Sequence, residues 1–227
     1  MRIFLSTAAA LAAALSIGAG GAAAQTADQR LAAGLLVGTN GIGGELKFRA
    51  AGNVVLRGSV EGFGLSRDVT YDDIDFQGKL KLFTGGVFID LHPSSTSPLF
   101  LSGGAYTGKR RVSIDAQPAS PVDIGDVTYT PAQVGTLRGA VEMSKFTPFL
   151  GVGIDSTFTS SSGWGFKSII GVAFSGRPDV ALTSTGGALS GNPAFLAQLE
   201  RERAQISDDA QVFKYYPVIS IGLSRRF

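Results

Sequence analysis

The chain ends with Tyr216-Pro217-Val218-Ile219-Ser220-Ile221-Gly222-Leu223-Ser224-Arg225-Arg226-Phe227, and this stretch decides the fold. Ile219, Ile221, Leu223 and Phe227 share one parity, while small or polar residues occupy the positions between them. Successive side chains of a β-strand point to opposite faces, so the pattern predicts a strand with one apolar face and one polar face.

The same alternation recurs along the chain, from Glu45-Leu46-Lys47-Phe48-Arg49 onward. Turn signals rich in Gly, Pro, Ser and Asn separate the segments, as at 51–53, 92–95, 144–148 and 160–163. Spacing of this kind is typical of an all-β protein. We predict eight long strands, at roughly 32–50, 53–66, 74–91, 98–115, 134–145, 148–157, 163–175 and 213–227.

The composition favours one β-rich domain that meets lipid. The 227 residues include 31 Gly and 15 Phe but a single Trp, which suits strands with lipid-facing outer surfaces. Lys plus Arg number 20 against 18 Asp plus Glu, scattered along the chain, which argues against nucleic acid as a partner. Cysteine is absent, which excludes disulfides, thiolate metal sites and a cysteine-linked lipid anchor.

The N-terminal residues 1–24 have the layout of a secretory signal peptide. Arg2 is followed by an apolar run and then by Ala22-Ala23-Ala24, which predicts cleavage after Ala24. The alternative is an uncleaved anchor, but the run is short and poor in Leu. The mature chain, 25–227, is then expected to be one outer-membrane β-barrel domain.

A closed antiparallel transmembrane β-barrel follows from two constraints. No later window holds about 18 consecutive apolar residues without charge, which excludes membrane-spanning helices. Lipid offers no hydrogen-bond partners to the backbone, so a closed barrel remains as the spanning structure.

The strand count has two versions. Eight strands give an even number. The short turns would then face outward, however, whereas bacterial barrels usually have their short turns on the periplasmic side. Splitting the first strand at Thr39-Asn40-Gly41 and adding a strand at 180–184 gives ten and returns both termini to the periplasm. We favour eight, because the Gly-rich stretch 35–48 can run through as one strand.

One segment has helical instead of strand periodicity. Asn192 can cap a helix that starts at Pro193, and 193–209 places Phe195, Leu199 and Ile206 on one side. We expect a solvated helix outside the membrane; the alternative is an interfacial helix or a plug for the barrel mouth.

Charged side chains of the inward parity form the main candidate site. An eight-stranded barrel is just wide enough for side chains to fill, so we expect a paired network that plugs the lumen; the alternative is a narrow ion path. The network comprises Glu45, Lys47, Arg49, Arg57, Glu61, Lys79, Lys81, Arg138 and Glu142, with Asp155 as a further candidate.

Aromatic residues form a second set, which could line a ligand site. We interpret them instead as girdle residues at headgroup level. They are Phe63, Tyr106, Phe149, Trp164, Phe166, Phe174, Tyr215 and Tyr216. Gly85-Gly86 and Gly103-Gly104 are explained by strand bending and close packing.

Four stretches resemble small outer-membrane barrels of the OmpA membrane domain, OmpW and opacity-protein type: 41–49, Asp90-Leu91-His92-Pro93, 147–153 and 216–227. The resemblance implies a monomeric barrel in the outer membrane of a Gram-negative bacterium, in contact with lipid and lipopolysaccharide. It also implies that Phe227 is a signal to the barrel-assembly machinery, although Arg225 replaces an aromatic often found there. The peptidoglycan-binding domain of full-length OmpA is not expected.

Enzymatic activity is not expected. His92-Pro93-Ser94 resembles a lipid A deacylase motif, but the asparagine expected after the serine is missing and the segment reads as an exposed turn. No Gly-rich phosphate loop, metal-ligand cluster or catalytic carboxylate pair is present, so we expect no cofactor. The favoured function is an envelope-structural or surface-interaction role; the alternatives are a narrow channel for small or hydrophobic solutes and a lipid A-modifying hydrolase.

Overall fold

The computed structural model describes residues 29–71 and 74–227. The predicted signal peptide, 1–24, lies outside the described residues. None of the helices within the described ranges is long and apolar enough to cross a membrane.

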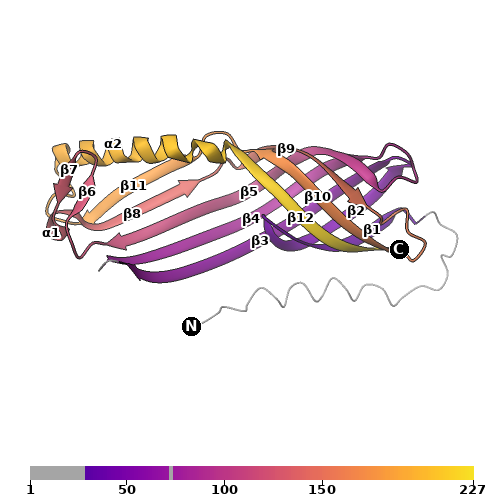
Figure 1. The fold of residues 1–227 in the computed structure, drawn as a ribbon, viewed down its shortest axis with the longest axis horizontal. Coiled ribbons are helices and arrows are strands. Elements are labelled where there is room, and N and C mark those ends of the chain that lie inside the picture. The colour runs from indigo at the N-terminus through magenta and orange to yellow at the C-terminus, as the bar shows by residue number, and fades with distance from the viewer. Residues whose placement is uncertain (1–28, 72–73) are drawn as a thin grey trace.

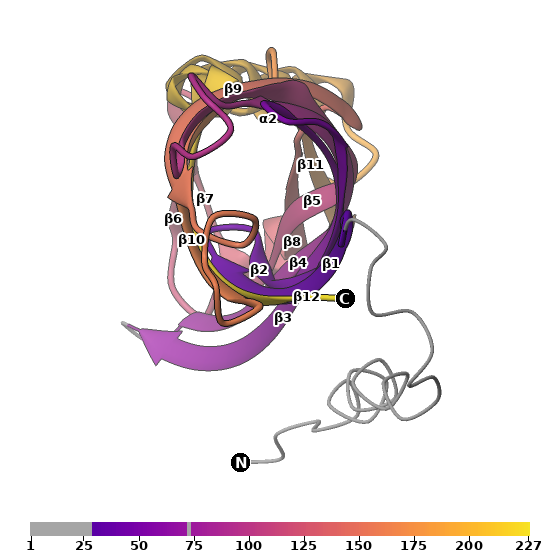
Figure 2. The same ribbon diagram turned by 90° about the vertical axis from the view of Figure 1, so that its right-hand side faces the viewer.

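Eight antiparallel strands close into a barrel (Figures 1 and 2). The ring closes through two pairings that join distant segments: β1 pairs with β12, and β5 pairs with β9. The ring consists of β1 (Leu31–Gly38), β2 (Gly41–Ala51), β3 (Val54–Tyr71), β4 (Ile74–Leu91), β5 (Leu99–Gln117), β9 (Phe146–Asp155), β10 (Trp164–Phe174) and β12 (Tyr215–Arg226). The predicted fold class and the count of eight are therefore confirmed.

The first predicted strand is in fact two, which corrects our preference for an unbroken 35–48. The chain reverses at Thr39-Asn40, and Gly38 pairs with Gly41 across the turn. Gly41 has a φ of 108°, a conformation that favours glycine. Tyr216 Oη donates to the Thr39 carbonyl at 2.6 Å, which fixes the turn against β12.

The predicted turn at 144–148 is also wrong, because the chain continues there in the same direction. β8 (Gly135–Glu142) pairs with the C-terminal part of β5, and β9 pairs with the N-terminal part of the same strand. Met143 N donates to Arg110 O at 3.0 Å, and Gly108 N donates to Lys145 O at 3.1 Å, so the ladder continues across the break. The predicted strand 134–145 thus lies beyond the ring.

An extension rises from one side of the barrel, where β3, β4 and β5 continue past the ring (Figure 1). β8 and β11 (Asp179–Gly186) widen it, so the ten-strand version was right about a strand near 180–184. The remaining elements are β6 (Val122–Ile124), β7 (Val127–Tyr129), α1 (Pro131–Val134), α2 (Pro193–Asp209) and η2 (Ala210–Lys214).

Helix α2 covers the extension and begins as predicted. The Asn192 side chain accepts from Ala194 N and Phe195 N, and Pro193 follows it. Phe195 and Leu199 are buried in a small core with Tyr129 and Val134. The helix therefore belongs to a folded cap above one wall, with its apolar stripe against protein.

The loops at the opposite end of the barrel are short. β2 and β3 join through 52–53, β4 and β5 through 92–98, and β9 and β10 through 156–163, all at the end where β1 begins and β12 finishes. The long connections all lie toward the extension. This is the usual arrangement of bacterial outer-membrane barrels, with short periplasmic turns and longer extracellular loops.

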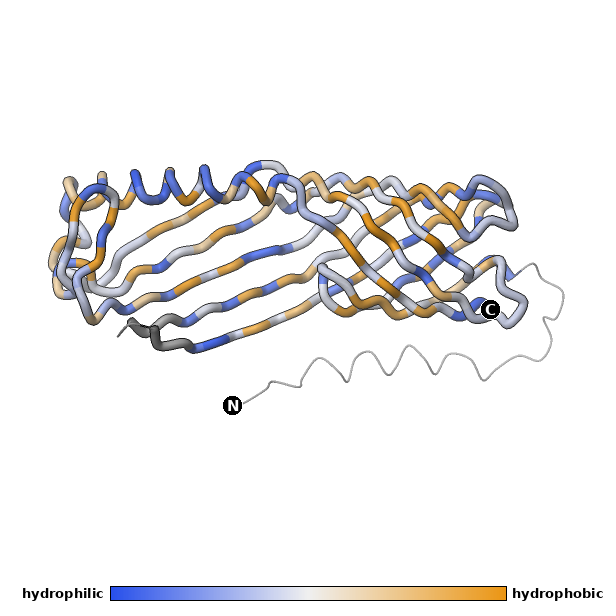
Figure 3. The backbone as a smooth tube through the Cα atoms, viewed as in Figure 1, coloured by the Kyte–Doolittle hydropathy of each residue, from blue (hydrophilic) through white to orange (hydrophobic). Residues whose placement is uncertain are grey.

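The outer face of the ring is apolar, and hydropathy alternates along its strands (Figure 3). Val87 and Phe83 of β4, for example, are 71% and 63% exposed, whereas Phe88 of the same strand is buried. Apolar side chains outside and charged ones inside are the reverse of a soluble domain and match the strand pattern of transmembrane barrels.

Candidate functional site in the barrel interior

The centre of the interior toward the short turns holds a buried chain of charges. Lys47 Nζ lies 2.9 Å from Glu45 Oε1 and 2.6 Å from Asp155 Oδ2, and it also donates to Thr157 Oγ1 and Ser224 Oγ. Lys167 Nζ lies 2.7 Å from the other Glu45 oxygen. Lys47 and Lys167 are each 1% exposed. Glu45 thus bridges two ammonium groups, and the strands β2, β9, β10 and β12 are tied together across the lumen.

A second buried ion pair lies on the neighbouring wall. Arg57 Nε and Nη2 donate to the two oxygens of Asp90 at 2.7 and 3.2 Å. Ser102 Oγ donates to Asp90 and accepts from Arg57. The Arg57 guanidinium lies 4.1 Å from the ring centroid of Phe88. A fork-to-fork contact of this kind is among the strongest in proteins.

The two groups balance in charge. Lys47, Lys167 and Arg57 face Glu45, Asp155 and Asp90, so each of these three cations has a carboxylate at 2.7 Å or closer. A buried charge without a partner costs several kcal/mol, so this pairing lets the barrel be filled by charged residues. Glu61 is also buried and accepts from Ser59 Oγ at 3.1 Å, but has no ion pair within the described ranges.

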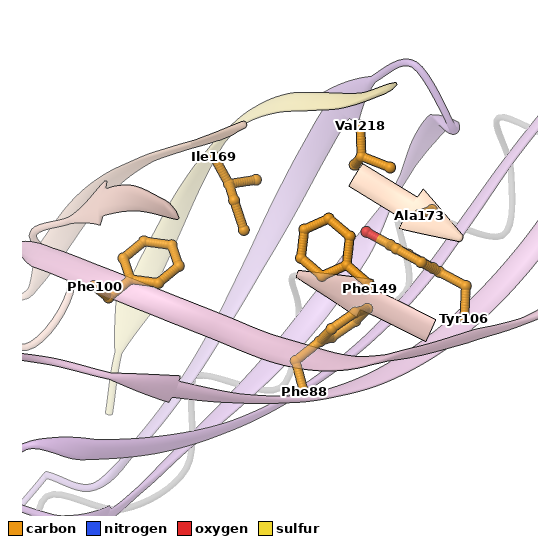
Figure 4. Close-up of a cluster of buried hydrophobic side chains, with 7 residues drawn as sticks. All are labelled: Phe88, Phe100, Tyr106, Phe149, Ile169, Ala173 and Val218. Atoms are coloured by element: carbon orange, nitrogen blue, oxygen red, sulfur yellow. The ribbon is translucent and has the colours of Figure 1, made fainter. Parts of the chain in front are cut away.

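Aromatic rings fill the next level of the lumen (Figure 4). Phe88, Tyr106 and Phe149 contact one another edge to face, with centroids 4.8 to 5.5 Å apart. Phe100, Ile169, Ala173 and Val218 complete this aromatic cluster. Tyr106 and Phe149 are therefore core residues, which corrects their prediction as girdle residues.

Inward-facing glycines make room for these rings. A Cβ on Gly86 would lie 2.4 Å from Phe88 Cζ, and one on Gly171 would lie 2.6 Å from the Phe149 ring. Gly104 likewise faces Phe88. Close packing, proposed from the sequence for Gly86 and Gly104, is the reason for these glycines.

Arg110 lies above the aromatic cluster, toward the extension. Its guanidinium is 5.4 Å from the Tyr106 centroid and 5.3 Å from the Tyr216 centroid, and Nη1 donates to Thr147 Oγ1 at 3.2 Å. Tyr216 is partly buried against the aromatic cluster, so it too is no girdle residue. From the short-turn end upward the lumen is thus charged, then aromatic, then capped by a cation between two rings.

The structure brings together only part of the predicted charge network. Glu45, Lys47, Arg57, Glu61 and the further candidate Asp155 are buried inside the barrel. Arg49 is half-buried near the short turns, where Nη2 donates to Ser95 O at 3.3 Å and the guanidinium lies 4.9 Å from the Phe158 ring.

The other four predicted lumen charges lie in the extension and face away from the interior. Lys79 and Arg138 are exposed and share Asp115, at 3.8 and 3.5 Å. Lys81 is exposed, and Glu142 is opposite Arg111 on the same outer face. The prediction failed here because beyond the ring the charged face is the outer one and the apolar face is the inner one.

Sequence reasoning missed Asp90 and Lys167. Each is a single charge between apolar or small neighbours, in Ile89-Asp90-Leu91 and Phe166-Lys167-Ser168. The signal was present, because both residues fall on the polar parity of their strands. A single charged residue on the polar face of an otherwise apolar strand therefore indicates a side chain that points into the lumen.

His92 and Ser94 form no catalytic pair. His92 Nδ1 lies 3.0 Å from the carbonyl oxygen of Ser97, and Ser94 Oγ lies 3.3 Å from Thr96 Oγ1 in an exposed turn. Within the described ranges, no group of three or more His, Asp or Glu side chains is placed to hold a metal ion.

The remaining girdle candidates are exposed. Trp164 and Phe166 mark the short-turn end of β10, and Phe174 contacts Tyr215 edge to face at the other end, with centroids 6.0 Å apart. Phe63 is exposed just above the ring, on the inward parity of β3. Phe227 is exposed, and its backbone N donates to Leu31 O at 3.0 Å.

Comparison with solved structures identifies similar folds. The crystal structure of Acinetobacter baumannii CarO2 matches with a TM-score of 0.58 and 20% identity, over 87% of this chain and 98% of that one. A. baumannii CarO matches with a TM-score of 0.57 and 20% identity, over 86% and 97%. A major outer membrane protein from Thermus thermophilus covers 87% of this chain at 15% identity and a TM-score of 0.32.

Sequence comparison adds no relative: no family model and no curated protein matches the chain. The structural matches extend over nearly the whole length of both CarO chains. The resemblance to the OmpA, OmpW and opacity-protein type stays a prediction. What the fold and its neighbours do show is that the chain is a β-barrel of the outer-membrane type.

Proposed function

We propose that this protein is a non-enzymatic outer-membrane barrel with a closed lumen, which serves the envelope as a structural or surface-interaction element. The apolar outer face of the ring supports insertion into a bilayer. The short turns lie at the end of the barrel where β1 begins and β12 finishes. This supports an orientation with the extension outside the cell.

One observation carries the proposal of a closed lumen: two successive levels of the interior are packed with side chains. Lys47 and Lys167 are 1% exposed at the charged level, and Phe88 and Phe149 are buried at the aromatic level. An ion path would need a continuous row of hydrated groups, and the aromatic cluster interrupts such a row.

The proposal is tested in two steps. Detergent-folded mature protein should migrate faster on gels before boiling than after, as closed barrels do; unchanged mobility would contradict the barrel in solution. Reconstituted into planar bilayers, it should give no discrete conductance steps, whereas regular steps from the unmodified protein would contradict a closed lumen.

Paired variants sharpen the second step. Phe88→Ala/Phe149→Ala removes two rings from the lumen and should allow ion leakage. Phe83→Ala/Phe146→Ala removes two rings from the outer face and should leave the bilayer as tight as the unmodified protein does. Equal conductance of both variants would mean that the aromatic cluster is not the seal.

A second candidate, passage of small hydrophobic solutes, is favoured by the inner face of the extension. Leu65, Val112 and Ile114 are exposed there on the inward parity, above the aromatic cluster. Uptake of an uncharged hydrophobic dye into protein-loaded liposomes, reduced by Leu65→Asn/Ile114→Asn, would support this function. No uptake above protein-free liposomes would exclude it.

A further inference from the structure

The apolar outer band ends abruptly on strands β4 and β5. The outward residues of β4 are apolar or small from Leu91 to Phe83, and the next outward position is Lys81. On β5 the outward row passes through Ala105 and Thr107 and then reaches Lys109 and Arg111. At about 3.3 Å per residue, Lys81 lies about 7 Å along the strand from Phe83.

Strand register gathers these cations at one place. Lys81 is directly opposite Arg111, and Phe83 is directly opposite Lys109, so all three cations lie on the outer face within one cross-strand neighbourhood. Like charges placed opposite each other destabilise a sheet. We call Lys81, Lys109 and Arg111 the basic cluster.

The basic cluster is not neutralised by the surrounding side chains that the structure describes. All three residues are exposed, and none forms a salt bridge with a described residue. Arg111 Nε donates to Ser113 Oγ at 3.2 Å, and Glu142 is its register partner on β8 without approaching to salt-bridge distance. One level farther out, Lys79 and Arg138 share Asp115, so pairing on this face begins only beyond the basic cluster.

The outward rows of four other ring strands end on uncharged residues. The outward residues at the corresponding ends of β1, β2, β10 and β12 are Val37, Ile42, Phe174 and Tyr215, all exposed and uncharged. On β4 and β5, in contrast, three cations in cross-strand register directly follow the apolar band, beside the exposed ring of Phe83.

We propose that the basic cluster binds the phosphate groups of lipid A in the outer leaflet, with Phe83 against its acyl chains. The inference rests on the proposed membrane location and orientation. Aromatic girdles flank the apolar band of a barrel at its interfaces, so the next positions along β4 and β5 reach the phosphates. A guanidinium can hold phosphate through two hydrogen bonds, and an ammonium attracts it as a point charge.

The test uses full mature protein in nanodiscs that contain phosphatidylcholine with a small fraction of lipid A. Native mass spectrometry then counts the lipid A molecules retained. The variant Lys81→Gln/Lys109→Gln/Arg111→Gln should lower retention at least about tenfold, since each basic residue near a membrane surface adds to anionic lipid binding. Added NaCl should weaken retention by the unmodified protein but not by this variant.

A matched control removes the same charge elsewhere. Arg138→Gln/Arg201→Gln/Arg203→Gln changes three arginines of the extension that already pair with Asp115, Asp126 and Glu200. This control should retain lipid A within about twofold of the unmodified protein, because each of these guanidinium groups already lies beside a carboxylate and none adjoins the apolar band. Equal loss in both triple variants, or no loss in the first, would overturn the inference.

The same samples separate this inference from the proposed function. If the protein enters phosphatidylcholine nanodiscs and keeps its heat-modifiable mobility but shows no preference for lipid A, only the lipid A site fails. If it does not enter nanodiscs at all, the membrane location fails and the site fails with it.

Discussion

Lys167 Nζ lies 2.7 Å from Glu45 Oε2, although the two residues are 122 positions apart in the sequence. Lys167 belongs to β10 and Glu45 to β2, and β1 and β12 separate these strands in the ring. The contact therefore crosses the lumen and does not follow the wall. Together with the Lys47 contacts it makes Glu45 the centre of the interior.

Glu45→Gln should destabilise the barrel by about 3 to 5 kcal/mol, because buried Lys167 loses its carboxylate partner and buried Lys47 keeps only Asp155. Urea unfolding of detergent-folded protein, followed by tryptophan fluorescence, measures the loss. Glu200→Gln, on the exposed face of α2, should change stability by less than about 0.5 kcal/mol. Similar small effects of both substitutions would show that the buried network contributes little.

The double variant Glu45→Gln/Lys167→Met should be more stable than Glu45→Gln alone. It removes the cation that Glu45→Gln leaves without a carboxylate and replaces it with an apolar chain of similar length. The same urea titration reports the difference. A double variant that is less stable than either single one would argue that Lys167 has a further partner.

Gly171→Ala should destabilise by about 1 to 3 kcal/mol through overpacking. Its Cβ would lie 2.5 Å from the Leu150 carbonyl and 2.6 Å from the Phe149 ring. Gly103→Ala is the control, since nothing lies within 4 Å of a Cβ there. Thermal unfolding of both variants should separate them clearly, and an equal melting temperature would contradict the tight packing of the aromatic cluster.

Asn192→Ala should cost about 1 kcal/mol locally, because two backbone N–H groups at the start of α2 lose their acceptor. Hydrogen exchange should quicken in the first turns of α2, whereas the ring strands keep their protection. If exchange quickens equally in β1 and β12, the cap is energetically coupled to the barrel.

Phe227→Ala should slow assembly in cells while leaving the folded barrel intact. Phe227 is exposed, and its backbone bond to Leu31 ties it to the wall whatever its side chain, so the loss of the ring should hardly affect refolding in detergent. The fraction of protein in purified outer membranes, compared with detergent refolding yield, distinguishes the two effects. Normal membrane levels would count against the assembly signal.

Alternation predicted the strands well because it is a local property that lipid and lumen both impose. It could not predict where the chain reverses. Thr39-Asn40 reverses it through a glycine with positive φ, whereas 144–148 has equally strong turn residues but lies along the edge of β5, whose long ladder keeps β8 and β9 in line.

Alternation predicted the interior residues correctly only within the ring, where the charged face of each strand points into the lumen. Glu45 and Lys47 alternate with Leu46 and Phe48 within the ring, and they face the lumen. Lys79 and Lys81 alternate with Leu80 and Leu82 in the same way, but lie beyond the ring, where the charged side chains are on the outer face of the sheet and the apolar ones on its inner face. The sequence shows which residues share a face of the strand. It does not show the position along the strand at which the charged face changes from the inside of the sheet to the outside.

The three tallest strands make the outer cap mechanically continuous with the barrel. β3, β4 and β5 run from the short-turn end to the far extension without an intervening hinge. A load applied to that tip by another cell or surface would therefore pass along these same strands as tilt and shear. It would arrive at Arg57, Asp90 and Ser102, which join β3, β4 and β5 near the short-turn ends of these strands.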